Sequence, residues 1–224
     1  MAAKDEFIAS VSHEDRTPLT AVLGFAAELD AHADEFSSEE RAELISLMAE
    51  QSREVASIVD DLLLAARAES GTVVIVPEIV SVRKLVGDVL CSHPRRADFV
   101  AHDDIDAWAD PGRVRQILRH LLTNADRRGG DSARLHVHRT GDGMVRLEVR
   151  DNGSGIPRHL HDHVFEPYAR DDSNPAEAAS LGLGISVAKR LARLMNGDLV
   201  LSEQDGWTVF TLLLPVALES AAAC

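Results

Sequence analysis

The sequence has few aromatic residues, only two cysteines and no long apolar run. Aromatic residues make up 4% of the 224 positions, so any core must be built mainly from Leu, Val, Ile and Ala. Cys91 and Cys224 belong to no CxxC or Cys/His pattern, which excludes a disulfide framework and favours a reduced compartment. No run approaches the roughly 18 apolar residues that a membrane-spanning helix needs, and the first residues lack a signal-peptide pattern. We therefore expect no direct membrane insertion by this chain.

Positive charge is also scarce. Lys and Arg number 23 against 37 Asp and Glu, which gives a formal net charge of −14. Nucleic-acid binding requires a clustered positive surface, so we expect no nucleic-acid partner. An acidic surface repels nucleotide phosphates unless positive groups or Mg²⁺ are placed locally, which makes any Arg beside a nucleotide motif informative.

The first part of the sequence predicts two amphipathic helices. The first, from residue 7 to about residues 32–35, carries a seam spaced alternately by three and four: Ile8, Val11, Asp15, Pro18, Val22, Phe25 and Leu29. The second begins after the N-cap signal at residues 37–41, ends at Gly71 and carries a similar seam: Leu44, Met48, Gln51, Val55, Ile58, Leu62 and Ala65. Two such helices bury too little surface alone, so the pattern predicts an antiparallel hairpin that dimerises into a four-helix bundle.

His13 lies off the seam of the first helix and is followed by Glu14. A histidine on the flank of a packed helix, beside a carboxylate, can act as a nucleophile or as a base. A surface histidine next to a surface glutamate is the plainer interpretation of the pair.

The pattern changes after Gly71 toward short β-rich runs, which places a domain boundary there. Residues 73–76 are expected as a short strand or linker, and residues 82–91 as a helix that ends before Pro94. The predicted strands are residues 99–102, 106–109, 135–139, 145–150, 198–203 and 207–214, the last two joined by a hairpin turn at residues 204–206. A mixed sheet with helices on one face, a two-layer α/β sandwich, follows, so the fold class is α+β.

A further helix is predicted to begin after Asp110-Pro111, where Asp110 is the N-cap. His120 and Asn124 are one turn apart on this helix and share a face. The amide oxygen of Asn124 can ligate Mg²⁺ that bridges nucleotide phosphates. A polar pair that serves only solubility is the alternative.

Two glycine turns supply the context for that helix. Asp151 ends an alternating strand and can accept a hydrogen bond from an exocyclic amine, while Gly153 and Gly155 let the backbone approach a flat ring. Gly182 and Gly184 open a later helix whose unpaired N–H groups suit a phosphate.

The residues 12–20, SHEDRTPLT, resemble the H box of sensor histidine kinases, whose usual form SHELRTPLT differs only at Asp15. By this resemblance His13 takes the γ-phosphoryl group of ATP, and Glu14 accepts or orients the imidazole proton. Thr17 matches the position that orients water when such proteins dephosphorylate their partner.

The second part of the chain resembles the Bergerat-type ATP-binding domain that histidine kinases share with gyrase, the heat-shock chaperone of the 90-kDa class and MutL. Asn124 lies in the counterpart of the N box, residues 151–155 and 182–184 match the two glycine boxes, and residues 165–168 match the F box. The resemblance implies that Asn124 ligates Mg²⁺, that Asp151 binds the adenine amine, and that four glycines shape the pocket: Gly153, Gly155, Gly182 and Gly184. It also places Arg127 at the usual lysine near phosphate and Arg170 at the basic residue after the F box.

Four positions depart from the family pattern. His120 replaces the first Asn of the N box, Arg128 replaces an aromatic residue, and Ser180 replaces a glycine that borders a lid expected at residues 172–179. A histidine at position 120 would activate water and waste ATP, or pack against phosphate. Asp15 replaces the leucine of the seam, where it weakens the dimer, makes its packing pH-dependent, or reaches water if the helix rotates.

These patterns predict three segments and one function. Residues 1–70 form the dimerisation and histidine phosphoacceptor domain, residues 71–218 the catalytic ATP-binding domain, and residues 219–224 a disordered tail. The resemblance implies ATP-dependent autophosphorylation on His13 with Mg²⁺, transfer to an aspartate of a response-regulator receiver domain, and phosphatase activity. Two rivals are a catalytically weak dimeric scaffold and an ATP-driven machine of the chaperone type. The expected location is cytoplasmic, and the chain is expected to be the catalytic core of a longer sensor. Whether that sensor is anchored in a membrane, which signal and regulator it uses, and whether transfer is in cis or in trans are left open.

Overall fold

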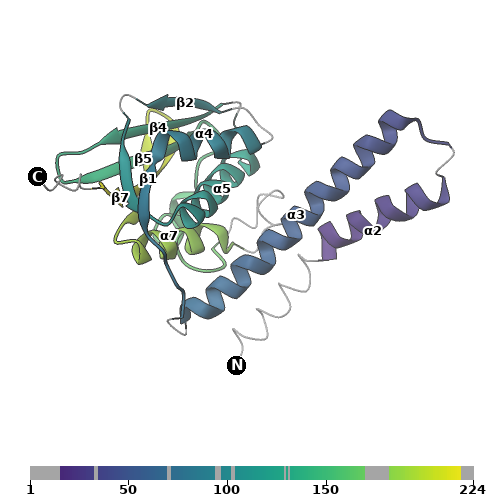
Figure 1. Cartoon of the computed structure of the whole chain (residues 1–224), viewed down its shortest axis with the longest axis horizontal. Coiled ribbons are helices and arrows are strands. Elements are labelled where there is room, and N and C mark those ends of the chain that lie inside the picture. Colours follow the sequence, from purple (N-terminus) through teal and green to yellow (C-terminus); the bar gives the residue numbers. More distant parts are fainter. Residues whose placement is uncertain are drawn as a thin grey trace, which may run out of the picture. The chain divides into compact units, whose positions relative to one another are not determined.

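The computed structural model describes residues 16–32, 35–69, 72–93, 97–101, 104–128, 130, 132–169 and 182–217. These residues form two compact units, one made of helices α2 and α3 and the other of all later elements (Figure 1). Several sequence predictions fall outside the described residues: those on His13, Glu14, Asp15, Arg170, Ser180, the lid at 172–179 and the tail at 219–224.

The first unit is an antiparallel hairpin of α2 (Arg16–Ala31) and α3 (Ser38–Glu69), which pack along each other (Figure 1). The predicted seam faces inward where it is described: Pro18 is buried, and the other members are half-buried, namely Val22, Phe25, Leu29, Leu44, Met48, Gln51, Val55, Ile58 and Leu62. The spacing of three and four therefore identified half-buried positions on both helices, whereas Asp61 and Leu64, the buried residues described on α3, lie off the predicted seam.

The start of α3 is fixed by a reciprocal cap between Ser37 and Glu40. The backbone N–H of Glu40 donates to Ser37 Oγ at 3.2 Å, and the backbone N–H of Ser37 donates to Glu40 Oε2 at 2.8 Å. These bonds satisfy donors that a helix start otherwise leaves open, which confirms the N-cap predicted here.

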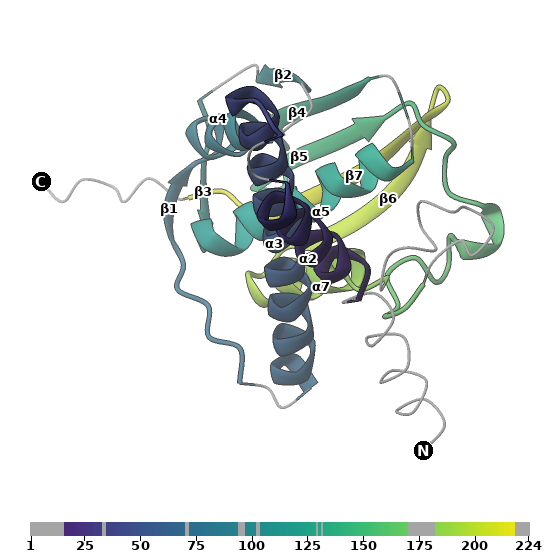
Figure 2. The ribbon, with the colours of Figure 1, turned by 90° about the vertical axis from the view of Figure 1, so that its right-hand side faces the viewer.

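The second unit is built on a mixed five-stranded sheet (Figure 2). Its strand order is β2 (Asp98–Ala101), β4 (Ala133–Arg139), β5 (Met144–Asp151), β7 (Trp207–Pro215) and β6 (Asp198–Gln204). Only β2 and β4 pair in parallel, and the other neighbours are antiparallel. The loop between β6 and β7 has positive φ angles at Asp205 and Gly206, as a tight type I′ hairpin requires.

Three helices cover one face of this sheet: α4 (Val82–Ser92), α5 (Pro111–Arg127) and α7 (Gly184–Leu194). Along β5 the apolar side chains that face inward are buried, while Arg146, Glu148 and Arg150 alternate with them and are more exposed. This alternation is typical of a sheet with one covered face, and the predicted two-layer α/β sandwich is confirmed. A short 3₁₀ turn, η1 (Arg158–Leu160), lies between β5 and α7.

The strand at residues 106–109 was predicted, but its pairing into a small second sheet was not. Residues 72–77 form no regular element, whereas β1 (Glu78–Ser81) pairs antiparallel with β3 (Asp106–Ala109). The Val76 N–H donates to Asp110 Oδ2 at 3.0 Å, which holds the incoming chain against the start of α5. Such pairing depends on a partner far away in sequence, so local pattern could not identify it.

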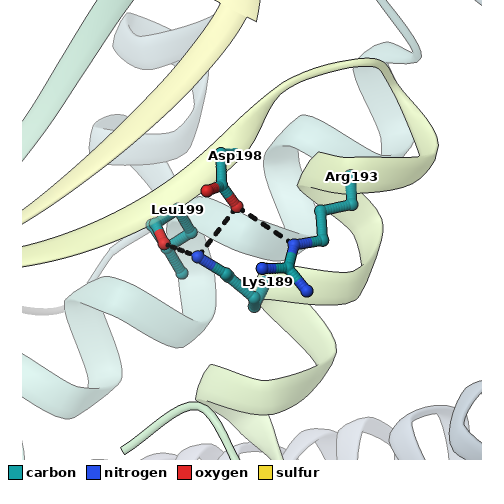
Figure 3. A network of polar contacts seen from close by, with 4 residues as sticks. All are labelled: Lys189, Arg193, Asp198 and Leu199. Carbon is teal, nitrogen blue, oxygen red and sulfur yellow. Dashed lines mark hydrogen bonds and ion pairs between the residues drawn. The ribbon is translucent and has the colours of Figure 1, made fainter. Parts of the chain in front are cut away.

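A polar network joins α7 to β6 (Figure 3). Lys189 Nζ donates to the Leu199 carbonyl at 2.6 Å and lies 2.8 Å from Asp198 Oδ1. Arg193 Nε lies 3.3 Å from the same carboxylate oxygen. Partial desolvation raises the pKa of Asp198, but the bonds from Lys189, Leu199 and Arg193 and the charge of Lys189 outweigh it and lower that pKa.

Candidate nucleotide site

The candidate site is organised by α5. Asp110 Oδ1 accepts hydrogen bonds from the N–H groups of Gly112 at 2.9 Å and Arg113 at 3.1 Å, so the predicted N-cap is confirmed. The apolar side of the helix is buried, namely Val114, Ile117, Leu118, Leu121 and Leu122. This burial fixes the rotation of α5 and leaves His120 and Asn124 one turn apart on a less buried side.

Asn124 lies in the last full turn of α5. Its side chain is half-buried, and its amide Nδ2 is buried without a hydrogen-bond partner among the described residues. Its backbone carbonyl accepts the N–H of Arg128 at 3.2 Å. A buried N–H donor without a hydrogen-bond partner costs free energy, which a bound hydrogen-bond acceptor would recover.

Asp151 is the last residue of β5 and is 2% exposed. Its Oδ1 accepts the N–H of Gly153 at 3.1 Å. Burial raises the pKa of this carboxyl, and the hydrogen bond from Gly153 and the positive charge of Arg128 offset only part of that rise. A buried carboxylate that accepts a local backbone N–H retains capacity to accept another donor.

The turn that follows Asp151 rests on Arg128, the C-cap residue of α5. Arg128 is 7% exposed, its Nη1 donates to the Gly155 carbonyl, and its own carbonyl accepts the Ser154 N–H at 3.2 Å. A β-carbon on Gly153 would lie 2.7 Å from the Arg128 carbonyl oxygen, so this approach requires glycine. The sequence identified Arg128 only as a departure from a family pattern and missed this contact.

A second contact extends the same support. Asn152 Oδ1 accepts the Ser132 N–H at 2.9 Å, and a β-carbon on Gly130 would lie 2.6 Å from that oxygen. Sequence patterns had indicated no role for Gly130, Ser132 or Asn152. The pair of glycines directly after a predicted helix was the available signal that another backbone passes close by.

The second glycine turn meets α5 at His120. Gly184 is the first residue of α7, and a β-carbon there would lie 3.0 Å from His120 Nδ1. The preceding residue, Leu183, offers no side-chain cap, so the first N–H groups of α7 are left to other partners. α5 therefore contacts the first glycine turn through Arg128 and the second through His120.

The F-box segment is tied to the second glycine turn by the backbone. The Tyr168 N–H donates to the Gly182 carbonyl at 3.1 Å, and both residues have positive φ, 70° and 64°. A β-carbon on Gly182 would lie 2.8 Å from the Ala169 carbonyl oxygen. Phe165 packs edge-on to Phe210 with ring centroids 6.4 Å apart, and Lys189 Nζ lies 4.5 Å from the Phe165 ring centroid.

The structure thus brings most of the predicted nucleotide residues to one helix and the two turns against it: Asn124, Arg127, Asp151, Gly153, Gly155, Gly182 and Gly184. Arg127 is the half-buried last residue of α5. Thr17 falls in the first turn of α2, and its side chain is not among those described. Across the described ranges, no three His, Cys, Asp or Glu side chains are grouped to hold a metal ion.

Comparison with known families matches two segments of this chain. Residues 3–71 match the His Kinase A (phospho-acceptor) domain, and residues 109–218 match the histidine kinase-, DNA gyrase B- and HSP90-like ATPase.

Among curated proteins, the probable sensor histidine kinase TcrY of Mycobacterium tuberculosis is 32% identical over 94% of this chain and 46% of its own length. The signal transduction histidine-protein kinase AfsQ2 of Streptomyces coelicolor is 31% identical over 95% of this chain and 42% of its own length. The chain therefore spans less than half the length of these relatives.

Among solved structures, full-length ShkA in complex with AMPPNP superposes with a TM-score of 0.64 at 26% identity, covering 96% of this chain and 47% of that one. The Acinetobacter baumannii histidine kinase AdeS shares the fold, with a TM-score of 0.63 at 22% identity over 92% of this chain and 98% of that one.

The order of the two matched domains and the fold agree with the relatives along nearly the whole sequence. The chain belongs to the sensor histidine kinases of two-component signal transduction and comprises their catalytic core, with an ATP-binding domain of the gyrase and HSP90 type. Among the described residues, no helix is long and apolar enough to cross a membrane.

Proposed function

We propose that this chain transfers the γ-phosphoryl group of ATP to His13 and then to an aspartate of a response-regulator receiver domain. The observation that carries the proposal is the convergence of two glycine turns on α5, through Arg128 and His120, in a chain whose first domain contains an H box. Residues 1–70 would be the dimerisation and phosphoacceptor domain and residues 71–218 the catalytic domain.

Asp151 is the proposed adenine-binding residue. Its carboxylate is buried and accepts the N–H of Gly153 in the glycine turn. It can accept a further hydrogen bond from the exocyclic amine of adenine, a donor that hypoxanthine lacks. Gly153 and Gly155 shape the turn over which the base would lie. The complex of ShkA with AMPPNP supports nucleotide binding by this fold.

The phosphates are proposed to lie at the start of α7. The uncapped N–H groups after Gly182 and Gly184, together with the positive end of the helix dipole, favour an anion there. Arg127 and Arg170 would add positive charge, which this acidic chain needs close to a polyphosphate.

Mg²⁺ fits Asn124. Its buried Nδ2 has no hydrogen-bond partner among the described residues and, as a donor, suits a phosphate oxygen, which leaves the amide oxygen for the ion. The described residues form no all-protein metal cage. Mg²⁺ binds nucleotides through few protein oxygens and completes its shell with phosphates and water, so one amide oxygen is a suitable donor. When bound, the ion would neutralise charge on the phosphates.

The transfer step is proposed for His13 and Glu14. One imidazole nitrogen of His13 attacks the γ-phosphorus in line, the bond to the β-phosphate oxygen breaks, and ADP leaves. Glu14 accepts or orients the proton on the other imidazole nitrogen. Thr17 would orient water for the opposing phosphatase activity, in which the aspartyl phosphate of the regulator is hydrolysed to aspartate and inorganic phosphate.

A second copy of this chain is the proposed partner of the hairpin. Beyond its inward seam, the hairpin exposes a further set of large apolar side chains: Leu19, Leu23, Ile45, Leu47, Val59 and Leu63. A four-helix bundle would remove such side chains from water. The same surface supports a homodimer as the functional state.

The test is incubation of the chain with Mg²⁺ and γ-labelled ATP. Acid-labile label on the chain, absent from His13→Gln and retained by the control His32→Gln directly after α2, would support the proposal. Label that survives in His13→Gln would contradict it. Transfer is then measured by adding a receiver domain, whose aspartate should acquire the label as His13 loses it.

A catalytically weak scaffold is the second candidate, favoured by one observation. His120 occupies the space beside Gly184 where the family has Asn, so the second glycine turn packs against a larger ring. ADP binding without label on His13 would favour the scaffold. Steady ATP hydrolysis that survives His13→Ala would instead indicate a chaperone-type machine.

A further inference from the structure

Arg128 is a charged side chain buried against the glycine turn that follows Asp151. It is 7% exposed, and buried guanidinium groups are stable only when hydrogen bonds and nearby negative charge compensate their desolvation. The Gly155 carbonyl and the Asp151 carboxyl supply both forms of compensation.

The turn itself is flexible by composition. Gly153 and Gly155 have no side chains, and Gly155 has a φ of 74°, which other residues rarely adopt. Arg128 contacts the turn twice, with Nη1 on the Gly155 carbonyl and with its own carbonyl on the Ser154 N–H. It therefore connects the end of α5 to the turn after Asp151.

The backbone of Arg128 extends this connection to Asn124, because the Arg128 N–H donates to the Asn124 carbonyl at 3.2 Å. A single residue thus joins the helical turn that carries the candidate Mg²⁺ ligand to the turn that carries the candidate adenine ligand. The bond from Nη1 to the Gly155 carbonyl is one that an aromatic side chain, the family's usual residue at this position, could not make.

We propose that Arg128 is a positioning residue for base recognition: by holding residues 153–155 against the end of α5, its guanidinium fixes the Asp151 carboxylate where it can accept an adenine amine. This proposal rests on the proposed role of Asp151. If it holds, Arg128 controls the preference for adenine over hypoxanthine. A substitution of Arg128 should then change the ratio of the two dissociation constants more than it changes the affinity for a hypoxanthine nucleotide.

The experiment measures the dissociation constants of ADP and IDP for the full chain by titration calorimetry. IDP carries a carbonyl oxygen where ADP carries the amine, and neither nucleotide is a phosphoryl donor to His13, so binding is measured without turnover. The variants are Arg128→Gln and Arg128→Lys, with Arg119→Gln as the control for loss of an exposed arginine on the same helix. Asp151→Asn tests the underlying assignment.

The native chain should bind ADP on the order of 10- to 100-fold more tightly than IDP, as one hydrogen bond to a charged group implies. Arg128→Gln should reduce this ratio to about 3-fold or less while IDP binding changes little, because the bond that fails is the one to the amine. Arg128→Lys, which keeps the charge and a donor, should give an intermediate ratio. Arg119→Gln should leave both constants unchanged.

Equal losses of ADP and IDP binding in Arg128→Gln would mean that Arg128 only stabilises the fold, and would overturn the inference. An unchanged ratio would overturn it as well. If thermal melting shows that Arg128→Gln does not fold, Arg128→Lys decides: a reduced ratio supports the inference and a native ratio contradicts it. If the native chain does not distinguish ADP from IDP, or if Asp151→Asn still does, the assignment of Asp151 itself fails.

Discussion

The imidazole of His120 lies against Gly184 so closely that a β-carbon on that glycine would be 3.0 Å from Nδ1. The contact joins the helix that carries Asn124 to the first residue of α7. We therefore expect substitutions at His120 and Gly184 to have coupled effects on the free energy of unfolding.

We expect Gly184→Ala to destabilise the chain by about 1–2 kcal/mol, because the new methyl group must displace the His120 ring. His120→Ala removes that obstruction, so the double variant should lose less stability than the two single variants together. Urea unfolding of the four proteins measures the coupling. Gly87→Ala in α4 is the control, because a β-carbon there meets nothing within 4 Å. Strictly additive losses would show that the two residues do not interact.

Asp151→Asn should raise the stability of the nucleotide-free chain at neutral pH. The folded pKa of Asp151 is raised above its unfolded value by burial, so its favourable contribution is present at acidic pH and lost as pH rises through the folded pKa. The neutral amide avoids that loss. Thermal midpoints from acidic to neutral pH should therefore diverge, with the variant higher at neutral pH.

The same variant should bind ADP more weakly, because an amide is a poorer acceptor than a carboxylate. Stability and binding are thus expected to change in opposite directions at one residue. A native midpoint at neutral pH together with native ADP affinity would contradict both parts of the prediction.

The cap of α3 predicts a pH-dependent helix start. Ser37→Ala should cost about 1 kcal/mol, because it removes the acceptor for the Glu40 N–H. The hydrogen bonds from the Ser37 backbone and side chain lower the pKa of Glu40, so its contribution is present above the unfolded value and is lost as pH falls through the folded value. Glu40→Gln should weaken this dependence, and Glu39→Gln, one residue earlier, should not. Helix melting followed by circular dichroism makes the comparison.

Lys189→Met should destabilise the second unit by about 1–3 kcal/mol, since it removes a half-buried bond to a charged partner. Arg193→Gln should cost less, because Arg193 is more exposed and its contact is longer. Asp198 has a lowered pKa, so the native advantage is present above its unfolded pKa and should shrink as pH falls through the lowered one. Urea unfolding at neutral and at acidic pH tests this. A difference that stays constant with pH would exclude Asp198 as the partner that matters.

Local pattern predicted the elements that carry the candidate site. Asp110 marked the start of α5, the alternation along β5 marked its buried face, and Asp205 and Gly206 marked the final hairpin. Each of these features is governed by residues within a few positions, through caps, pleat or turn geometry. The glycine turns could be recognised as sites for a nucleotide for the same reason, because each is defined by a few neighbouring residues.

Pairing between distant segments could not be predicted in this way. Two neighbouring predicted strands entered different sheets, since β2 pairs in parallel with β4 whereas β3 pairs with β1. Strand pairing depends on the packing of the whole layer and not on the residues of one strand alone. Arg128 illustrates the same limit at the site, because its partner Gly155 lies 27 residues away along the chain.

The sequence by itself determined the family, the helical seams, the order of the domains' motifs and the residue types available for phosphoryl transfer, because these are properties of short stretches. Only the tertiary structure decided that His120 packs against Gly184, that Arg128 supports the turn after Asp151, and that burial raises the pKa of that carboxyl. Contacts and desolvation are created when distant segments fold together, so no local pattern encodes them.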